Sequence, residues 1–212
     1  MIRNIGAQSS VFNQYLAEIR DSVIQTDPIR FRTNMERMAS IFAYEISKEL
    51  AYEVREVTTP LGVAEVPELK EYPVVATILR AGLPMHRGML NIFDRSENAF
   101  VSAYRKHRKD GSFDVQVEYV SGPELTDKVV ILTDPMLATG GSAIDAITML
   151  KQKGAKNIRL MCLIAAEDGI KSVTEVHPDV DIYTAAIDKE LNKNGYIVPG
   201  LGDAGDRLYG TK

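Results

Sequence analysis

Residues 128–143 read KVVILTDPMLATGGSA, and the rest of the chain is best understood by working outward from this stretch. Its first part, Val129 to Leu132, is a short run of apolar and mostly β-branched residues, which is typical of a parallel strand buried on both faces. Its last part, Thr139 to Ser142, is followed by apolar residues at helical spacing. We therefore expect a strand, a turn and a helix in that order.

The turn between these two elements carries groups that suit a phosphorylated sugar. Asp134 stands at the carboxyl end of the strand, which is the edge where open α/β sheets bind their ligands. Gly140 and Gly141 precede the helix, where backbone N–H groups and the helix dipole favour an anion. The alternative is an ordinary turn in which Asp134 and Ser142 serve only as local caps. A Walker loop is excluded because no Gly-Lys-Ser/Thr follows.

The remaining sequence alternates between strand and helix patterns. Helices are expected over residues 9–24, 28–50, 83–92, 143–154 and 168–176, and strands over residues 73–79, 98–104, 157–165 and 179–187, with a hairpin over residues 53–66. This order predicts an α/β fold, with a parallel sheet that has helices on both faces. The length suits a single domain that spans residues 1–212.

Composition excludes several classes of protein. The 25 basic and 29 acidic residues give a net charge of −4, which argues against a general nucleic-acid or membrane-surface role. The N-terminus lacks a signal-peptide core and no apolar run approaches the ~20 residues that span a bilayer, so we expect a cytoplasmic protein. Cys162 lies in an apolar run and is expected to be a core thiol. The histidines are scattered, which gives no zinc site and no catalytic dyad.

Two further segments carry candidate binding groups. Leu79-Arg80-Ala81-Gly82 ends the strand expected at residues 73–79, and an arginine beside a glycine can approach an anion closely. The tail, residues 196–206, is rich in glycine and carries Asp203. Gly200 to Gly205 matches G-x-G-x-x-G, yet only seven residues follow, too few for the helix and strand of a Rossmann unit. Such a tail instead suits the recognition of a small planar ligand by exposed backbone groups.

These three segments together resemble the uracil phosphoribosyltransferase family. In that family the acidic residue of the central stretch binds the ribose hydroxyls of PRPP, Thr-Gly-Gly-Ser binds its 5′-phosphate, and Leu-Arg-Ala-Gly binds pyrophosphate. Pro135 fits the uracil branch, in which proline replaces a second acidic residue. The tail resembles the uracil-binding loop. Pro84 is a departure, because relatives often carry glycine at that position.

The resemblance implies a set of site residues. Those implied to bind PRPP are Arg80, Arg105, Asp134, Pro135, Met136, Leu137, Ala138, Thr139, Gly140, Gly141, Ser142 and Asp203. Those implied to bind uracil are Ile197, Gly202, Asp203 and Ala204. The catalytic residues are expected to be Asp134, Asp203 and Arg105, where Asp203 orients either a magnesium-bound water or the base. Arg105 begins a flexible hairpin that is expected to close over the site, and the role of residues 106–109 is left unassigned.

The implied reaction transfers the 5-phosphoribosyl group of PRPP to uracil, giving UMP and pyrophosphate in pyrimidine salvage. The implied cofactor is Mg²⁺, held through PRPP oxygens and waters with no direct protein ligand. A homo-oligomer (dimer or tetramer) and activation by GTP are further expectations from the family.

The alternatives are a non-catalytic nucleotide-sensing regulator on the same fold and, more weakly, an enzyme for another base. The complete tail favours the uracil enzyme, because a sensor needs no place for a free base. The resemblance covers about residue 28 to the end, and the first two dozen residues add little to it.

Overall fold

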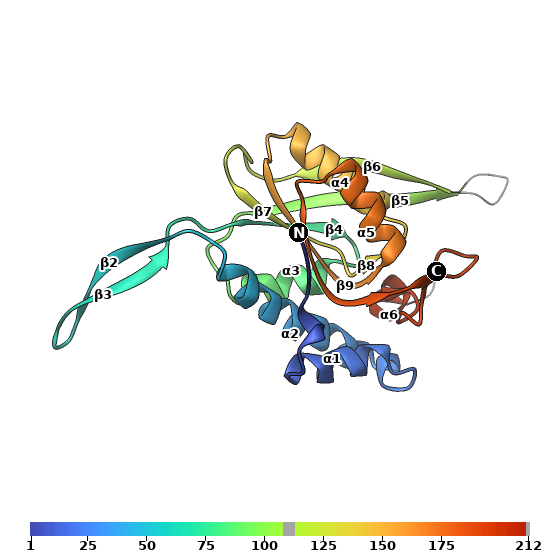
Figure 1. Cartoon of the computed structure of the whole chain (residues 1–212), viewed down its shortest axis with the longest axis horizontal. Coiled ribbons are helices and arrows are strands. Elements are labelled where there is room, and N and C mark those ends of the chain that lie inside the picture. Colours follow the sequence, from blue (N-terminus) through green and yellow to red (C-terminus); the bar gives the residue numbers. More distant parts are fainter. Residues whose placement is uncertain (108–112, 211–212) are drawn as a thin grey trace.

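The computed structural model describes the backbone of residues 1–107 and 113–210, and the side chains of residues 1–102 and 119–210. Its centre is a sheet in the order β1-β10-β9-β7-β4-β5-β6, with the short β8 paired to β9. The pairings along this sheet are parallel except the one between β5 and β6. Helices cover both faces (Figure 1), so the expected α/β fold is confirmed.

The sequence predictions locate most of these elements to within a few residues. The strands are β1 (Ile2–Asn4), β2 (Tyr52–Thr59), β3 (Gly62–Leu69), β4 (Val74–Leu79), β5 (Asn98–His107), β6 (Phe113–Ser121), β7 (Val129–Thr133), β8 (Met136–Leu137), β9 (Asn157–Ala166), β10 (Asp181–Asp188), β11 (Glu190–Leu191) and β12 (Ile197–Val198). The α-helices are α1 (Val11–Arg20), α2 (Pro28–Ser47), α3 (Leu83–Leu90), α4 (Gly141–Gln152), α5 (Glu167–Val176) and α6 (Ala204–Tyr209), with 3-10 turns η1 (Ile5–Ala7) and η2 (Ile24–Thr26). No helix in these ranges is long and apolar enough to cross a membrane.

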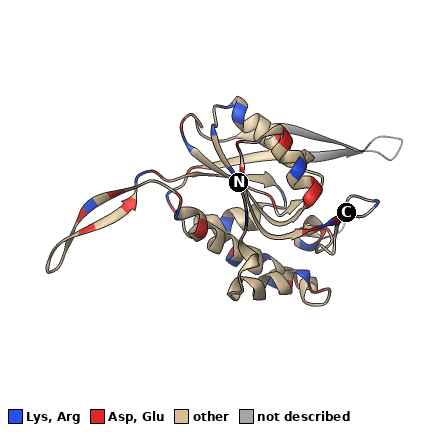
Figure 2. Cartoon of the chain, in the orientation of Figure 1, with Lys and Arg blue, Asp and Glu red and all other residues tan. Residues whose placement is uncertain are grey.

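The central strands are apolar throughout because both of their faces are buried. In β7, Ile131 packs with α1, α2 and α3, whereas Val130 and Leu132 pack on the opposite face with α4 and α5. Successive side chains of a strand point to opposite faces, so one continuous apolar run supplies both layers of the core. Outside the core, basic and acidic residues are interspersed along the described chain (Figure 2), in keeping with the small net charge.

The strand order reverses between β4 and β7, and this reversal fixes where a ligand can bind. From β4 the chain passes through α3 to β5 on one side, and after β6 it returns to β7 on the other side. Such a topological switch point leaves a crevice at the carboxyl ends of the two strands. The residues that directly follow β4 and β7 are Arg80 and Asp134, respectively. The fold therefore places two of the predicted site residues at the switch point.

The N-terminal residues take part in both the sheet and the core. Residues 2–4 form β1, which extends the sheet by pairing with residues 182–184 of β10. Helix α1 begins with a capping box at Ser10, and it buries Phe12 and Ile19 in the core. This part of the chain is therefore tied to a strand near the opposite end of the sequence.

Candidate active site

The turn that follows β4 folds back tightly on the strand ends. The amide of Gly82 donates to the carbonyl oxygen of Ile78 at 3.1 Å, and the Leu79–Arg80 peptide bond is cis. A β-carbon at Gly82 would overlap the hydroxyl of Thr77 and lie 2.8 Å from the carbonyl oxygen of Thr133. Glycine is thus required here because the turn touches the adjacent strand. The side chain of Arg80 is left exposed at the carboxyl edge of the sheet.

The loop after β7 is anchored by its backbone to β9. Half-buried Asp134 donates its amide to the carbonyl oxygen of Met161 at 3.0 Å, and the carbonyl oxygen of Pro135 accepts from the amide of Leu163 at 3.0 Å. Met136 and Leu137 form β8 beside Ile164 and Ala165. The side chains of Pro135 and Leu137 are buried, so we expect any ligand to meet the backbone of these residues.

Helix α4 begins at Gly141 without a side-chain cap. Its N-cap residue is Gly140, which has a φ of 89° and makes no side-chain capping bond. Ser142 lies inside the first turn of the helix, so neither Asp134 nor Ser142 is the N-cap of α4. The first backbone N–H groups of a helix have no partner inside the helix and suit an anion. The start of α4 is thus suited to an anion, and it follows Asp134 closely along the chain.

The C-terminal tail combines a tight turn with a short helix. Residues 197–204, which we call the tail loop, begin in β12 and end at the first residue of α6. The sequence analysis described this tail only as a glycine-rich segment, and helix α6 is a correction to that view. Asp203 is the N-cap of α6, and its Oδ1 accepts from the amide of Asp206 at 3.1 Å. Ile197 and Ala204 have buried side chains, so their backbone groups are what they can offer to a ligand.

Helix α6 places the tail directly beside the turn at Arg80. The hydroxyl of Tyr209 donates to the carbonyl oxygen of Arg80 at 3.0 Å, and the guanidinium of Arg80 lies over the Tyr209 ring, 5.6 Å from its centroid. Burial raises the pKa of Tyr209, which keeps its hydroxyl protonated as a donor. Arg32 of α2 donates to the carbonyl oxygen of Leu208 at 2.8 Å. The sequence analysis missed Tyr209 and Arg32, because nothing in their local sequence signals these contacts.

Arg105 lies in β5, where its backbone is opposite Val115 of β6. The antiparallel hairpin expected over this region is therefore present, with an irregularity in register between Ser102 and Ala103. The side chains of residues 103–118 lie outside the described part of the chain, and so does the backbone of residues 108–112. The contacts of Arg105, the role of residues 106–109 and the closing of the hairpin remain predictions.

Cys162 and the histidines lie outside the candidate binding groups. Cys162 is buried in the core, and burial raises the pKa of its thiol to about 12, which confirms it as an inert core thiol. Among the residues whose side chains are described, no group of three His, Cys, Asp or Glu side chains is placed to hold a metal ion.

Comparison with solved structures defines the class. The structure is similar to an orotate phosphoribosyltransferase of Mycobacterium tuberculosis in complex with PRPP, with a TM-score of 0.53 at 12% identity over 85% of this chain and 92% of that one. It is also similar to a protein of Aquifex aeolicus, with a TM-score of 0.89 at 30% identity over 100% of this chain and 99% of that one. The fold is that of the phosphoribosyltransferases.

Sequence comparison narrows this class to one family. The profile of uracil phosphoribosyltransferase matches residues 7–211. Curated uracil phosphoribosyltransferases of Porphyromonas gingivalis and Clostridium kluyveri are 50% and 59% identical to this chain. The first alignment covers 99% of this chain and 98% of the relative, and the second covers 93% of each. The chain belongs to the uracil phosphoribosyltransferase family and is a transferase; none of these comparisons favours a nucleotide-sensing regulator.

Proposed function

We propose that this chain transfers the 5-phosphoribosyl group of PRPP to uracil, giving UMP and pyrophosphate. The observation that carries the proposal is the meeting of three segments at one edge of the sheet. Arg80 and Asp134 follow neighbouring strands at the topological switch point, and Tyr209 of α6, the helix that follows the tail loop, contacts Arg80. Pyrophosphate, ribose and base therefore each have adjacent candidate groups.

Each residue is assigned a role by the segment in which it lies. The PRPP-binding residues are Arg80, Arg105, Asp134, Pro135, Met136, Leu137, Ala138, Thr139, Gly140, Gly141, Ser142 and Asp203, and the uracil-binding residues are Ile197, Gly202, Asp203 and Ala204. Asp134 accepts hydrogen bonds from the ribose hydroxyls, and the uncapped start of α4 receives the 5′-phosphate. Arg80 and Arg105 hold the pyrophosphate as it departs.

The reaction depends on how the enzyme positions its substrates more than on a strong general base. Displacement of pyrophosphate from the anomeric carbon builds positive charge on the sugar, as in glycoside cleavage. The enzyme must hold the base near that carbon and stabilise the leaving group. Asp203 has one carboxylate oxygen engaged in capping α6. Its other oxygen is the one that can orient the base or a magnesium-bound water.

Magnesium is the proposed cofactor. Mg²⁺ prefers one or two carboxylates together with phosphate oxygens and waters over a cage made of protein side chains. We therefore propose that the ion is held through PRPP oxygens and waters, with no direct protein ligand, and that Asp203 is the carboxylate that can contact a magnesium-bound water. When bound with PRPP, the ion would neutralise charge that develops on the departing pyrophosphate.

The direct test is an assay of UMP formation from uracil and PRPP. We expect activity that requires both substrates and is lost when EDTA removes Mg²⁺. The same assay with and without GTP tests whether GTP is an activator, which the family resemblance suggests. If PRPP binds in calorimetry but no UMP forms in the presence of Mg²⁺, the chain is a sensor and the proposal is refuted.

We also propose a single domain that works as a homo-oligomer. The β2–β3 hairpin forms its own two-stranded sheet and projects from the body of the protein (Figure 1). One face of it carries Val54 and Val63, which are 66% and 65% exposed. An isolated two-stranded hairpin is marginally stable in water, so this arm fits packing against a second copy. Light scattering of the purified protein measures the number of copies.

The two arginines are expected to act on pyrophosphate. Arg80→Ala and Arg105→Ala should each weaken binding of PRPP and of pyrophosphate together, because both ligands carry the charge that a guanidinium recognises. The KM for uracil should change little. Calorimetric titration with pyrophosphate measures the effect, and Arg87→Ala, on the exposed face of α3, is the matched control. Undiminished pyrophosphate affinity in both variants contradicts the assignment.

A further inference from the structure

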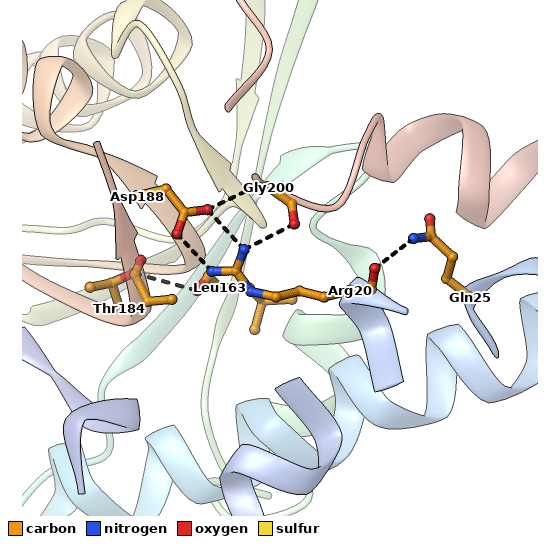
Figure 3. A network of polar contacts seen from close by, with 7 residues as sticks. Arg20, Gln25, Leu163, Thr184, Asp188 and Gly200 are labelled. Carbon is orange, nitrogen blue, oxygen red and sulfur yellow. Dashed lines mark hydrogen bonds and ion pairs between the residues drawn. The ribbon is translucent and has the colours of Figure 1, made fainter. Parts of the chain in front are cut away.

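A buried ion pair joins the N-terminal helix to the end of the sheet beside the tail loop. Arg20 is the last residue of α1, and Asp188 is the last residue of β10. Nη1 of Arg20 donates to Oδ2 of Asp188 and Nη2 donates to Oδ1, each at 2.9 Å (Figure 3). The side chains of Arg20 and Asp188 are 22% and 8% exposed. A bidentate pair of this kind fixes both the distance and the orientation of its two groups.

The same pair engages both backbone groups of Gly200 in the tail loop. The amide of Gly200 donates to Oδ2 of Asp188 at 2.9 Å, and its carbonyl oxygen accepts from Nη1 of Arg20 at 3.0 Å (Figure 3). Gly200 has a φ of 56°, and a β-carbon there would overlap the carbonyl oxygen of Ile197. The backbone of this turn is therefore held from outside by two charged side chains, one from α1 and one from β10.

We propose that Arg20 and Asp188 are positioning residues that set the base selectivity of the enzyme. The proposal rests on the proposed role of the tail loop in binding uracil. Since both polar groups of Gly200 are engaged by the pair, the proposed contacts to the base come from its neighbours in the tail loop, Ile197 and residues 201–204. The positions of these neighbours follow from that of Gly200. A recognition site has to hold its groups to within about 0.5 Å of the productive geometry, so a loosened turn weakens the discrimination between bases.

The effect should be confined to the base side of the site. Asp134 and Arg80 follow β7 and β4, and β9 separates both of these strands from β10 in the sheet. A disturbance at Asp188 therefore reaches the tail loop directly, through Gly200, and reaches Asp134 and Arg80 only through intervening structure. The proposal predicts a change in the KM for uracil without a matching change in the KM for PRPP.

A second ion pair on the same helix provides a matched control. Glu18 of α1 accepts from Nε and Nη2 of Arg30 in α2, both at 2.7 Å, and from Asn34 at 2.6 Å. These hydrogen bonds, the one from Arg30 first, lower the pKa of Glu18 from 4.5 to about 2. The stability that the charge of Glu18 contributes is therefore complete above pH 4.5 and is lost as the pH falls toward 2. Glu18→Gln should thus weaken the docking of α1 at neutral pH without touching the tail loop.

The experiment compares Arg20→Lys, Asp188→Asn and Glu18→Gln by steady-state kinetics and thermal unfolding. Lysine keeps the charge but cannot bond Asp188 in a bidentate manner while also reaching Gly200. We expect Arg20→Lys to raise the KM for uracil about tenfold and to lower the preference for uracil over cytosine by a similar factor, while the KM for PRPP stays within about twofold. Asp188→Asn should show the same pattern more weakly, because an amide oxygen still accepts from Gly200. Glu18→Gln should lower only the melting temperature.

The outcomes separate this proposal from the assignment of the loop itself. Gly202→Ala, at a residue with a φ of 88°, distorts the tail loop directly and should also raise the KM for uracil. If Gly202→Ala has this effect while Arg20→Lys and Asp188→Asn keep the wild-type KM for uracil, the positioning role is refuted and the loop assignment stands. If Arg20→Lys and Glu18→Gln alter both KM values alike, the pair is merely structural. If no variant alters the KM for uracil, the loop assignment itself fails.

Discussion

Asp134→Asn is expected to raise the KM for PRPP and to lower kcat/KM by at least about tenfold, which corresponds to roughly 1.4 kcal/mol or more. Asparagine keeps the shape of the side chain but replaces a charged acceptor with a weaker neutral one. The fold should be little changed, because the backbone bond from Asp134 to Met161 does not depend on the side chain. Initial-rate kinetics with varied PRPP, together with thermal unfolding, measure both properties.

A matched control for this prediction lies one helical turn into α4. Asp145 is half-buried, and burial raises the pKa of its carboxyl group, yet no role in binding is assigned to it. Asp145→Asn should therefore leave the KM for PRPP unchanged. If Asp134→Asn instead has wild-type kinetics and a much lower melting temperature, the carboxylate serves the fold and not the ribose.

The central strand, turn and helix could be predicted from sequence because their signals are local. The apolar run of β7 is continuous since the strand is buried on both faces, and the glycines at the start of α4 mark the proposed anion site within a few residues. The order of strands and helices then predicts a parallel sheet, and the carboxyl ends of its strands are where Asp134 and Arg80 lie. Periodicity and turn residues were sufficient for this part of the site.

The contacts that hold the tail in place could not be predicted in the same way. Arg20 and Asp188 are 168 positions apart, and no local pattern distinguishes Arg20 from any other arginine at the end of a helix. Tyr209 and Arg80 are 129 positions apart, and their contact depends on where α6 packs. Helix α6 itself was missed because it is short and follows a glycine-rich stretch. Long-range partners of this kind follow from the packing of the whole chain.

The prediction with the largest effect concerns the choice of base, and it rests on a loop that recognises its ligand through the backbone. Uracil presents a carbonyl group at position 4 and an N–H group at position 3, whereas cytosine presents an amine and a bare acceptor nitrogen there. A loop that donates to the first position and accepts from the second meets opposed groups when cytosine enters. Buried polar groups left unpaired cost about 1–3 kcal/mol each, and a site built for one pattern can reject its reverse by ~10⁴-fold or more.

We therefore expect activity with uracil, tolerance of small 5-substituents such as fluorine, and no useful activity with cytosine or purines. Ala204→Gly should change the selectivity little, because the side chain of Ala204 is buried and its backbone is what a base can meet. Deletion of residues 200–212 should abolish uracil use, since it removes the loop, its attachment to Arg20 and Asp188, and the contact of Tyr209 with Arg80. Measurement of kcat/KM for each base, with calorimetry of PRPP binding to the truncated protein, tests both expectations.

Comparable kcat/KM values for cytosine and uracil, or UMP formation by the truncated protein, would overturn recognition by the tail loop. Retained PRPP binding without UMP formation would support it, because the groups proposed to hold PRPP lie mainly on the β4 and β7 loops.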